Sequence, residues 1–269
     1  MKLRLLTAVI GIPGIIFCLI VRGWFAELVI EAAAMIGMFE CYRALRAAKY
    51  KISPFGGYLA VLVMLPLSQL FGVKDPLILV TAAMGISMAG VIMGKEPTFP
   101  NAAATLYPIF TVLLPFSILL LMINSTFGTV PGVALITLAF SIAYGCDAMA
   151  FFGGKTMGKH KLCPTISPNK TVEGGVSGLI GGILFSLACR AVFVYGFKMP
   201  MPGVPAAIVL GLIGAFAGQI GDLTASILKR YSGIKDYGKI FPGHGGIIDR
   251  MDSVNFVLIV IYCYTLLLK

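Results

Sequence analysis

The sequence predicts an all-α, polytopic integral membrane protein with about nine transmembrane helices. Two features of its composition favour this class: 58% of the 269 residues are hydrophobic and only 12% are charged. Soluble domains carry about 25% charged residues. The third observation is that the apolar residues come in runs close to the ~20 residues that an α-helix needs to cross a bilayer.

Nine apolar segments are candidate spans: 4–21, 24–42, 55–72, 75–94, 103–124, 130–153, 173–196, 204–228 and 250–268. Prolines fall inside some of them, at Pro13, Pro66, Pro108 and Pro115. Membrane helices tolerate proline when neighbouring groups satisfy the freed carbonyls. Glycine-rich stretches at 174–182 and 211–218 favour close packing between helices.

The N-terminal segment begins with Lys2 and Arg4 and continues as an apolar run, as a secretory signal peptide would. No small-residue cleavage site follows, because the next residues are Arg22, Gly23 and Trp24. We therefore expect a retained first span. The six cysteines form no C-x-x-C pair and lie mostly in apolar runs, so we expect them to be small buried side chains.

The formal net charge of +10 could indicate a nucleic-acid partner. Here, however, the charges lie in short connections between apolar segments. This placement favours the membrane surface, anionic lipid headgroups and phosphates as partners, and no nucleic acid.

The basic residues also predict an orientation. With nine spans, 16 of the 21 lysines and arginines fall on the side of the N-terminus, and Arg190 lies within a span. Only four fall on the other side: Arg22, Lys74, Lys198 and Lys269. The positive-inside rule then places the N-terminus and the polar connections 154–172 and 229–249 in the cytoplasm. The expected location is the cell (inner or plasma) membrane.

The first polar constellation is GCDAMAFFGGKTMGKHKLCPTISPNKTVEGG, residues 145–175. Asp147 lies within the sixth predicted span, where a carboxylate needs a polar cavity, a metal or a cation beside it. The letters GGKT at 153–156 are not a P-loop, because Met149 stands where that motif requires glycine.

The connection after this span carries lysines that could bind phosphate as point charges. These are Lys155, Lys159, Lys161 and Lys170. The alternative is that they only fix the topology. Ser167, Pro168 and Asn169 predict a turn, and Thr171 is expected to open the next helix.

The second constellation is GDLTASILKRY, residues 221–231. On a helix, Asp222, Ser226 and either Lys229 or Arg230 lie on one face. An aspartate paired with a lysine could be structural. A carboxylate, a hydroxyl and cations on one face favour a site for a metal ion and a phosphate.

The third constellation is KDYGKIFPGHGGIIDRMD, residues 235–252. Its glycines surround His244 and let the backbone approach an anion closely. Asp249 and Asp252 are three residues apart at the start of the last helix, and they indicate a hard cation such as magnesium. Helix capping is an alternative role for Asp249. His244 could equally be a hydrogen-bonding loop residue, a base or a ligand.

The segment SILKRYSGIKDYGKIFPGHGGIIDRMD, residues 226–252, resembles throughout the signature of the phosphatidate cytidylyltransferases, or CDP-diacylglycerol synthases. SPNKTVEGG at 167–175 is similar to another element of that family. The segment DAMAF at 147–151 is a looser match, because the family has a hydroxyl residue beside the aspartate. The role of Asp147 is therefore less defined.

The resemblance implies that CTP and phosphatidic acid give CDP-diacylglycerol and pyrophosphate. It also implies a magnesium requirement and a homodimer within membrane lipids, and it leaves open a second, monovalent cation. We expect residues 1–128 to be a scaffold with the dimer contacts and residues 129–269 to carry the catalytic site on the cytoplasmic side.

The expected roles follow the motif. Asp222 and Asp249 are assigned to the metal, with Asp252 and Asp147 as supports. Phosphate would be held by Lys170, Lys229 and Arg250, and the pocket lined by Ser226 and His244. Further substrate-binding candidates are Ser167, Lys155, Arg230 and Lys239.

Two other functions use similar residues. A CTP-dependent lipid kinase, of the polyprenol type, would transfer the γ-phosphoryl group and leave CDP. An ion-coupled transporter could also place acids within the membrane. A transporter usually needs access from both faces, whereas here the charges gather on one.

The predicted orientation can be tested with single cysteines at Ser167 and Lys239 in a background without native cysteines. Impermeant thiol reagents should label both positions only from the cytoplasmic side, because both connections carry the basic excess. Labelling from outside intact cells would contradict the nine-span topology.

Overall fold

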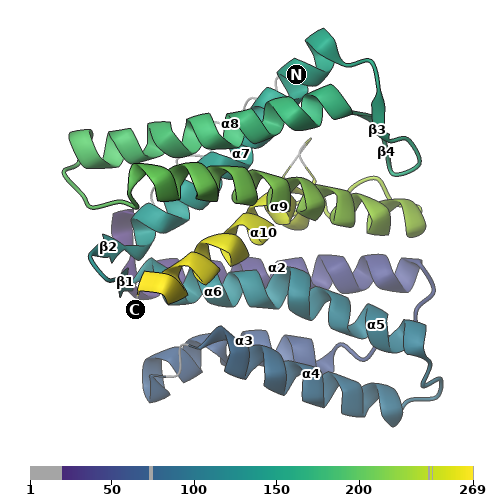
Figure 1. Cartoon of the computed structure of the whole chain (residues 1–269). Coiled ribbons are helices and arrows are strands. Elements are labelled where there is room, and N and C mark those ends of the chain that lie inside the picture. Colours follow the sequence, from purple (N-terminus) through teal and green to yellow (C-terminus); the bar gives the residue numbers. More distant parts are fainter. Residues whose placement is uncertain (1–19, 73–74, 242, 244, 269) are drawn as a thin grey trace. The chain divides into compact units, whose positions relative to one another are not determined.

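The structure is a computed structural model, which describes residues 20–72, 75–241, 243 and 245–268. The chain forms two compact units, whose helices and strands are labelled in Figure 1. The first unit takes its residues from Met1–Asn124 and Leu228–Met251, and the second from Ser125–Ile227 and Asp252–Lys269. The first predicted span, 4–21, lies almost wholly outside the described residues.

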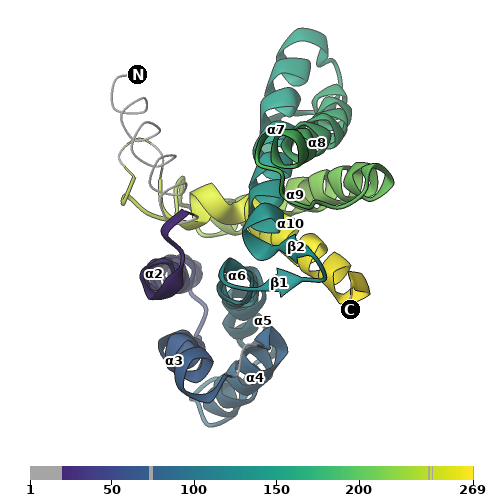
Figure 2. The ribbon, with the colours of Figure 1, turned by 90° about the vertical axis from the view of Figure 1, so that its left-hand side faces the viewer.

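The first unit is helical along its N-terminal part. Its elements are α2 (Gly23–Ala47), α3 (Phe55–Phe71), α4 (Pro76–Ile92), α5 (Phe99–Pro108), the π-helical η1 (Ile109–Leu113) and α6 (Leu114–Ile123). Helices α3 and α4 pack side by side, and α2 packs against α3 and α6 (Figure 2). Tyr42, Met38 and Phe116 are among the largest side chains in the buried core.

The second unit begins with a short antiparallel pair of strands and continues as long helices. Its elements are β1 (Thr126–Phe127), β2 (Val130–Pro131), α7 (Gly132–Met157), β3 (Lys161–Cys163), β4 (Ser167–Thr171), α8 (Val172–Ala191), η2 (Val192–Gly196), α9 (Val204–Tyr231), α10 (Ile248–Thr265) and the 3₁₀ helix η3 (Leu266–Leu268). Helices α7 and α8 pack against each other (Figure 2). The end of α9 and the start of α10 belong to the first unit.

Five helices in the described part of the chain are long and apolar enough to cross a membrane. They cover Phe99–Ile123, Gly132–Met157, Val172–Gly196, Val204–Tyr231 and Ile248–Leu268. Helices α3 and α4 are apolar but shorter, with 17 residues each. The helical fold class is confirmed, and eight predicted ranges coincide with described helices. The count of nine crossing helices remains a prediction.

The two prolines of the fifth predicted span are accommodated by a π-helical turn. Pro108 ends α5, and Pro115 lies in the first turn of α6. Between them, the N–H of Leu114 bonds the carbonyl of Ile109, five residues back. Since proline lacks an N–H and its ring clashes with the carbonyl four residues before it, the wider turn keeps the helix continuous.

Two helices begin with a side-chain cap at their N-termini. Asp75 precedes Pro76 at the start of α4, and its Oδ1 accepts a hydrogen bond from Leu77 N at 2.9 Å. Thr171 caps α8, where its Oγ1 accepts from Gly174 N at 3.1 Å. The prediction that Thr171 opens this helix is confirmed.

The predicted turn at Ser167–Asn169 is wrong in its position. Ser167–Thr171 is instead strand β4, which pairs antiparallel with β3. Lys161 pairs with Thr171 and Cys163 pairs with Ser167, so the turn falls between these strands. The short connection could not be recognised as a hairpin because its strands are too brief to show an alternating pattern.

The glycine runs allow helices to approach closely within the second unit. A Cβ atom added at Gly182 of α8 would lie 2.4 Å from the Ala215 Cβ and 2.6 Å from the Gly211 carbonyl oxygen, both on α9. Ser186 of α8 adds a hydrogen bond of 2.7 Å to the Ala207 carbonyl. The predicted close packing of the segments 174–182 and 211–218 is therefore confirmed.

We expect Gly182→Ala to destabilise the protein by about 1–3 kcal/mol, because the added methyl group overpacks the contact between α8 and α9. Gly85→Ala in α4 is the matched control, since an added Cβ meets nothing within 4 Å there. The control should be neutral or stabilising by up to about 1 kcal/mol. Thermal unfolding in detergent measures both. Equal shifts of the two midpoints would contradict the packing assignment.

Candidate functional site

The second unit brings three predicted site residues together. Lys170 extends from β4 and forms an ion pair with Asp222 of α9. Ser226, one turn further along α9, donates a long hydrogen bond of 3.4 Å to Asp222 Oδ1. The side chains of Lys170 and Asp222 are 28% and 27% exposed, so solvent and small ligands can reach this pair. We call Lys170, Asp222 and Ser226 the α9 cluster.

The hairpin that carries Lys170 is fixed at its base by Glu173. The carboxylate accepts hydrogen bonds from the backbone N–H groups of Lys159 and His160, at 3.1 and 3.2 Å to Oε2. It also lies 2.6 Å from His160 Nδ1. These contacts join the start of α8 to the chain just before β3, and so they hold the hairpin and its lysine in place.

Asp147 belongs to the same neighbourhood. It lies on α7 and is exposed, and its neighbour Cys146 contacts the Gln219 side chain of α9 at 3.4 Å. The expectation that Asp147 supports the other carboxylate stays a prediction. Ser167 lies at the start of β4, and Lys155 is exposed in the last turn of α7.

The first unit brings Lys229 and Asp249 together. Lys229 Nζ lies 3.0 Å from Asp249 Oδ1, and the two side chains are 16% and 4% exposed. Asp249 Oδ2 accepts hydrogen bonds from Tyr237 N at 2.7 Å and Gly246 N at 2.9 Å. We call Lys229, Asp249, Tyr237 and Gly246 the α10 cluster. Its carboxylate is buried and fully engaged, which is what an ionised group away from water requires.

Asp249 therefore organises the loop before α10. It lies in the first turn of that helix, yet its oxygens bond N–H groups of residues before the helix. The predicted capping role is thus present in a modified form. Asp249 lies inside the first turn, and its side chain accepts hydrogen bonds from backbone N–H groups that precede the helix. Gly245 has φ +85°, and a Cβ there would lie 2.5 Å from Asp249 Oδ2, so a glycine is required. His244 lies outside the described residues.

The sequence analysis did not identify Tyr237 as a site residue. Its side chain is fully buried, and its ring lies 5.6 Å from Lys229 Nζ. Burial raises the pKa of its hydroxyl, which therefore stays neutral. Arg43 of α2 donates a hydrogen bond to the Tyr237 carbonyl, and Glu40 of α2 accepts one from Ile248 N. The sequence offered one signal for Glu40, an acid inside an apolar segment.

The remaining candidates lie on the surface or near it. Arg230 is exposed at the end of α9, Lys239 is exposed in the loop, and Arg250 is exposed in the first turn of α10. Asp252 is partly exposed, and its Oδ1 accepts from Ser253 N at 2.8 Å. The expectation that Asp252 supports the metal site of Asp249 stays a prediction.

The two aspartates suit a hard cation by their chemistry, because carboxylate oxygens are the ligands that magnesium prefers. Each already has an ammonium group beside it, from Lys170 or from Lys229. A metal ion would share or replace that partner. Asp222 is the more accessible, whereas Asp249 also accepts two backbone N–H groups. Within the described ranges, no group of three or more His, Cys, Asp or Glu side chains could hold a metal.

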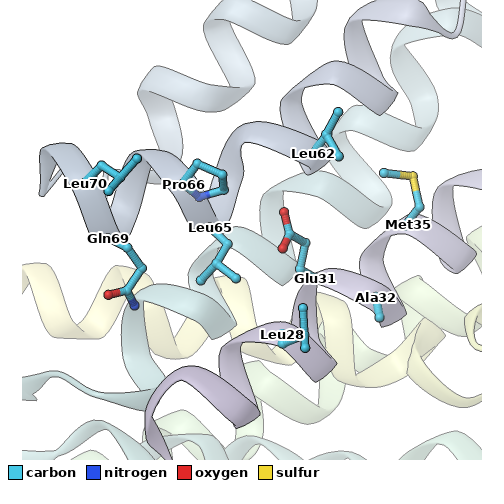
Figure 3. A pocket seen from close by; sticks show the side chains of 9 residues that line it. All are labelled: Leu28, Glu31, Ala32, Met35, Leu62, Leu65, Pro66, Gln69 and Leu70. Atoms are coloured by element: carbon cyan, nitrogen blue, oxygen red, sulfur yellow. The ribbon is translucent and has the colours of Figure 1, made fainter.

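A pocket of about 500 Å³ lies elsewhere in the first unit, between α2 and α3 (Figure 3). Its walls are mostly apolar side chains, with Glu31 of α2 pointing toward α3 and Gln69 near one end. Glu31 Oε1 is buried and has no hydrogen-bond partner in the described part of the chain. Among the described residues that line this pocket, none is a predicted site residue.

Comparison with known proteins identifies the family. A model of the cytidylyltransferase family matches residues 2–268. The chain is 32% identical to the phosphatidate cytidylyltransferase of Bacillus subtilis (strain 168), over 97% of this chain and 96% of the relative. Its identity to the phosphatidate cytidylyltransferase of Staphylococcus saprophyticus is 34%, over 96% of both chains. With one family model along almost its whole length and relatives above 30% identity, the chain belongs to the cytidylyltransferase family.

Proposed function

We propose that the protein transfers the cytidylyl group of CTP to phosphatidic acid, giving CDP-diacylglycerol and pyrophosphate. The observation that carries the proposal is the family match along nearly the whole chain, with relatives named phosphatidate cytidylyltransferase. The two clusters support it, because their aspartates and lysines belong to the segments that resemble the family signature. Both substrates are anions, and their reaction needs such charges.

The chemistry is a phosphoryl-type transfer. A phosphate oxygen of phosphatidic acid attacks the α-phosphorus of CTP, a new P–O bond forms, and the bond to the β-phosphate breaks to release pyrophosphate. No strong base is needed, because the nucleophile is already an anion. Catalysis then depends on positioning and on neutralising charge. Lys170, Lys229 and Arg250 hold phosphates in this scheme.

Magnesium, when bound, would supply charge neutralisation at the phosphates. Asp222 and Asp249 are the residues that would hold it, and a second, monovalent cation remains open. In either case the aspartates orient Lys170 and Lys229 through the ion pairs described above. Ser226 orients Asp222 through its hydroxyl group.

The other candidates take supporting roles in the proposal. Asp252 and Asp147 assist the two main carboxylates, and His244 lines the substrate pocket. Ser167, Lys155, Arg230 and Lys239 contribute to substrate binding. Their exposure suits contact with a water-soluble nucleotide and with lipid headgroups.

The proposed setting is the cell (inner or plasma) membrane. Nine transmembrane helices would place the N-terminus and the site in the cytoplasm, where CTP is dissolved and phosphatidic acid is held in the adjoining leaflet. We also propose a homodimer whose contacts lie in residues 1–128, with the catalytic residues in residues 129–269. Five helices of membrane-spanning length support the membrane setting.

The reaction can be tested with CTP labelled at either end of its triphosphate. Label at the α-phosphate should enter the lipid, and label at the γ-phosphate should leave as pyrophosphate, because the bond between the α- and β-phosphates breaks. Added pyrophosphate should regenerate CTP from CDP-diacylglycerol, since one phosphoanhydride replaces another. Recovery of γ-label in the organic phase would instead identify a lipid kinase. Full activity in excess EDTA would contradict the magnesium requirement.

We expect Asp222→Asn and Asp249→Asn each to lower kcat by about 10²–10³-fold, because each removes a negative charge that organises the phosphate-binding cations. Initial rates at saturating substrates and magnesium measure the effect. Glu96→Gln is the matched control, since Glu96 is an exposed carboxylate paired only with Lys51 at 3.2 Å among the contacts described. Near-normal turnover of either aspartate variant would refute its assignment.

A further inference from the structure

The end of helix α2 contacts the start of α10 through a buried glutamate. Glu40 is only 2% exposed, and its Oε2 accepts a hydrogen bond from Ile248 N at 3.1 Å. This N–H belongs to the first residue of α10, next to Asp249. Gly37, one turn earlier on α2, leaves room for the Ile248 side chain, which would lie 3.1 Å from an added Cβ. Glu40 therefore caps α10 from another part of the chain.

The loop before α10 is shaped around the Glu40 carboxylate. A Cβ added at Gly246 would lie 2.1 and 2.3 Å from the two Glu40 oxygens, and one at Gly238 would lie 1.9 Å from Oε1. Neither glycine has a positive φ. Their small size, rather than their backbone freedom, is what the structure uses. The backbone at both points comes close to a carboxylate that any side chain would displace.

Arg43, one turn after Glu40, holds the other end of the same loop. Its guanidinium group donates to the carbonyl of Tyr237, whose N–H donates to Asp249 Oδ2. Arg43 and Asp249 thus both bind Tyr237, Arg43 through its carbonyl and Asp249 through its N–H. The two peptide groups that flank the Tyr237 Cα atom therefore each have a charged partner. At the N-terminus of α10, Glu40 accepts from Ile248 N, and Asp249 accepts from Gly246 N just before the helix.

Burying Glu40 is unfavourable without a specific use. One of its oxygens, Oε1, is buried with no hydrogen-bond partner in the described part of the chain. The nearby carboxylate of Asp249 also repels it. An apolar side chain of similar size would avoid both penalties. The arrangement fits a residue retained for the geometry that it imposes.

We propose that Glu40 and Arg43 are positioning residues for cytidylyl transfer, which fix the loop and the helix end that orient Asp249 and Lys229. This inference rests on the proposed function. Neither residue needs to touch a substrate, since each acts through Ile248 N or the Tyr237 carbonyl. Their substitution should therefore change the rate of the bound complex more than substrate affinity.

We expect Glu40→Gln and Arg43→Met each to lower kcat at least about 10-fold, because small misplacements of catalytic groups are costly. KM for CTP and for phosphatidic acid should change less than about 3-fold, since the phosphate contacts remain. Arg43→Lys should recover part of the loss, because a lysine can still donate to the Tyr237 carbonyl. Unchanged kcat in Glu40→Gln and Arg43→Met would overturn the inference. So would a loss of kcat/KM that comes entirely from a higher KM.

A double-mutant cycle tests the contact itself. Gly246→Ala should lower kcat and the unfolding midpoint, because the three nearest atoms to its new Cβ all belong to Glu40. In the Gly246→Ala background, Glu40→Ala should lower kcat and the unfolding midpoint less than it does in the wild type, since the methyl group added at position 246 then occupies the space that the Glu40 carboxylate has vacated. Gly238→Ala is the matched control. Its new Cβ would also lie 2.8 Å from the Gly246 Cα, and Glu40→Ala cannot remove this backbone clash. Additive effects at Gly246 would overturn the contact.

The two proposals fail in different ways. A wild-type protein that makes no CDP-diacylglycerol refutes the reaction, while the coupling between positions 40 and 246 can still be read from thermal unfolding. An active wild type with full turnover in Glu40→Gln and Arg43→Met refutes only the positioning role. If Glu40→Ala does not fold, the kinetics of Glu40→Gln, Arg43→Met and Arg43→Lys still test the positioning role.

Discussion

The buried carboxylate of Asp249 determines the conformation of the chain around it. An ionised group with little access to water is stable only when donors surround it. Lys229 supplies one donor from α9, and the backbone of Tyr237 and Gly246 supplies two more. A segment rich in glycine can bring its N–H groups that close. The loop between α9 and α10 is therefore organised by this charge together with the buried side chain of Tyr237.

The α9 cluster follows a different rule. Lys170 and Asp222 are each about one-quarter exposed, so water screens their attraction and the pair adds little to stability. Such a pair can change partners at small energetic cost. The hairpin keeps Lys170 within reach because Glu173 binds the backbone at its base. A fixed hairpin that carries an exchangeable ion pair suits a site that must admit a charged ligand.

The sequence was sufficient for the helices but not for the contacts that hold the loop. Apolar runs predict helices because burial in lipid demands a continuous run, and α7 to α10 appear at the expected positions. Asp222 and Ser226 are four residues apart on one helix, so their proximity also followed from periodicity. The pairing of Lys170 with Asp222 and of Glu40 with Ile248 depends on how distant segments pack, which a single sequence does not encode locally. The β3–β4 hairpin was missed because its strands are short.

The π-helical turn at Ile109–Leu113 has a consequence for helical phase. A bond that spans five residues in place of four accommodates one residue more than an α-helix would at the same axial length. The π-helical turn is therefore equivalent to the insertion of one residue into an α-helix. Successive α-helical residues are rotated by about 100°. Deleting one residue of this segment would let an ordinary α-helix form and keep α6 facing its present neighbours, whereas deleting one from α5 or α6 would rotate every side chain beyond it.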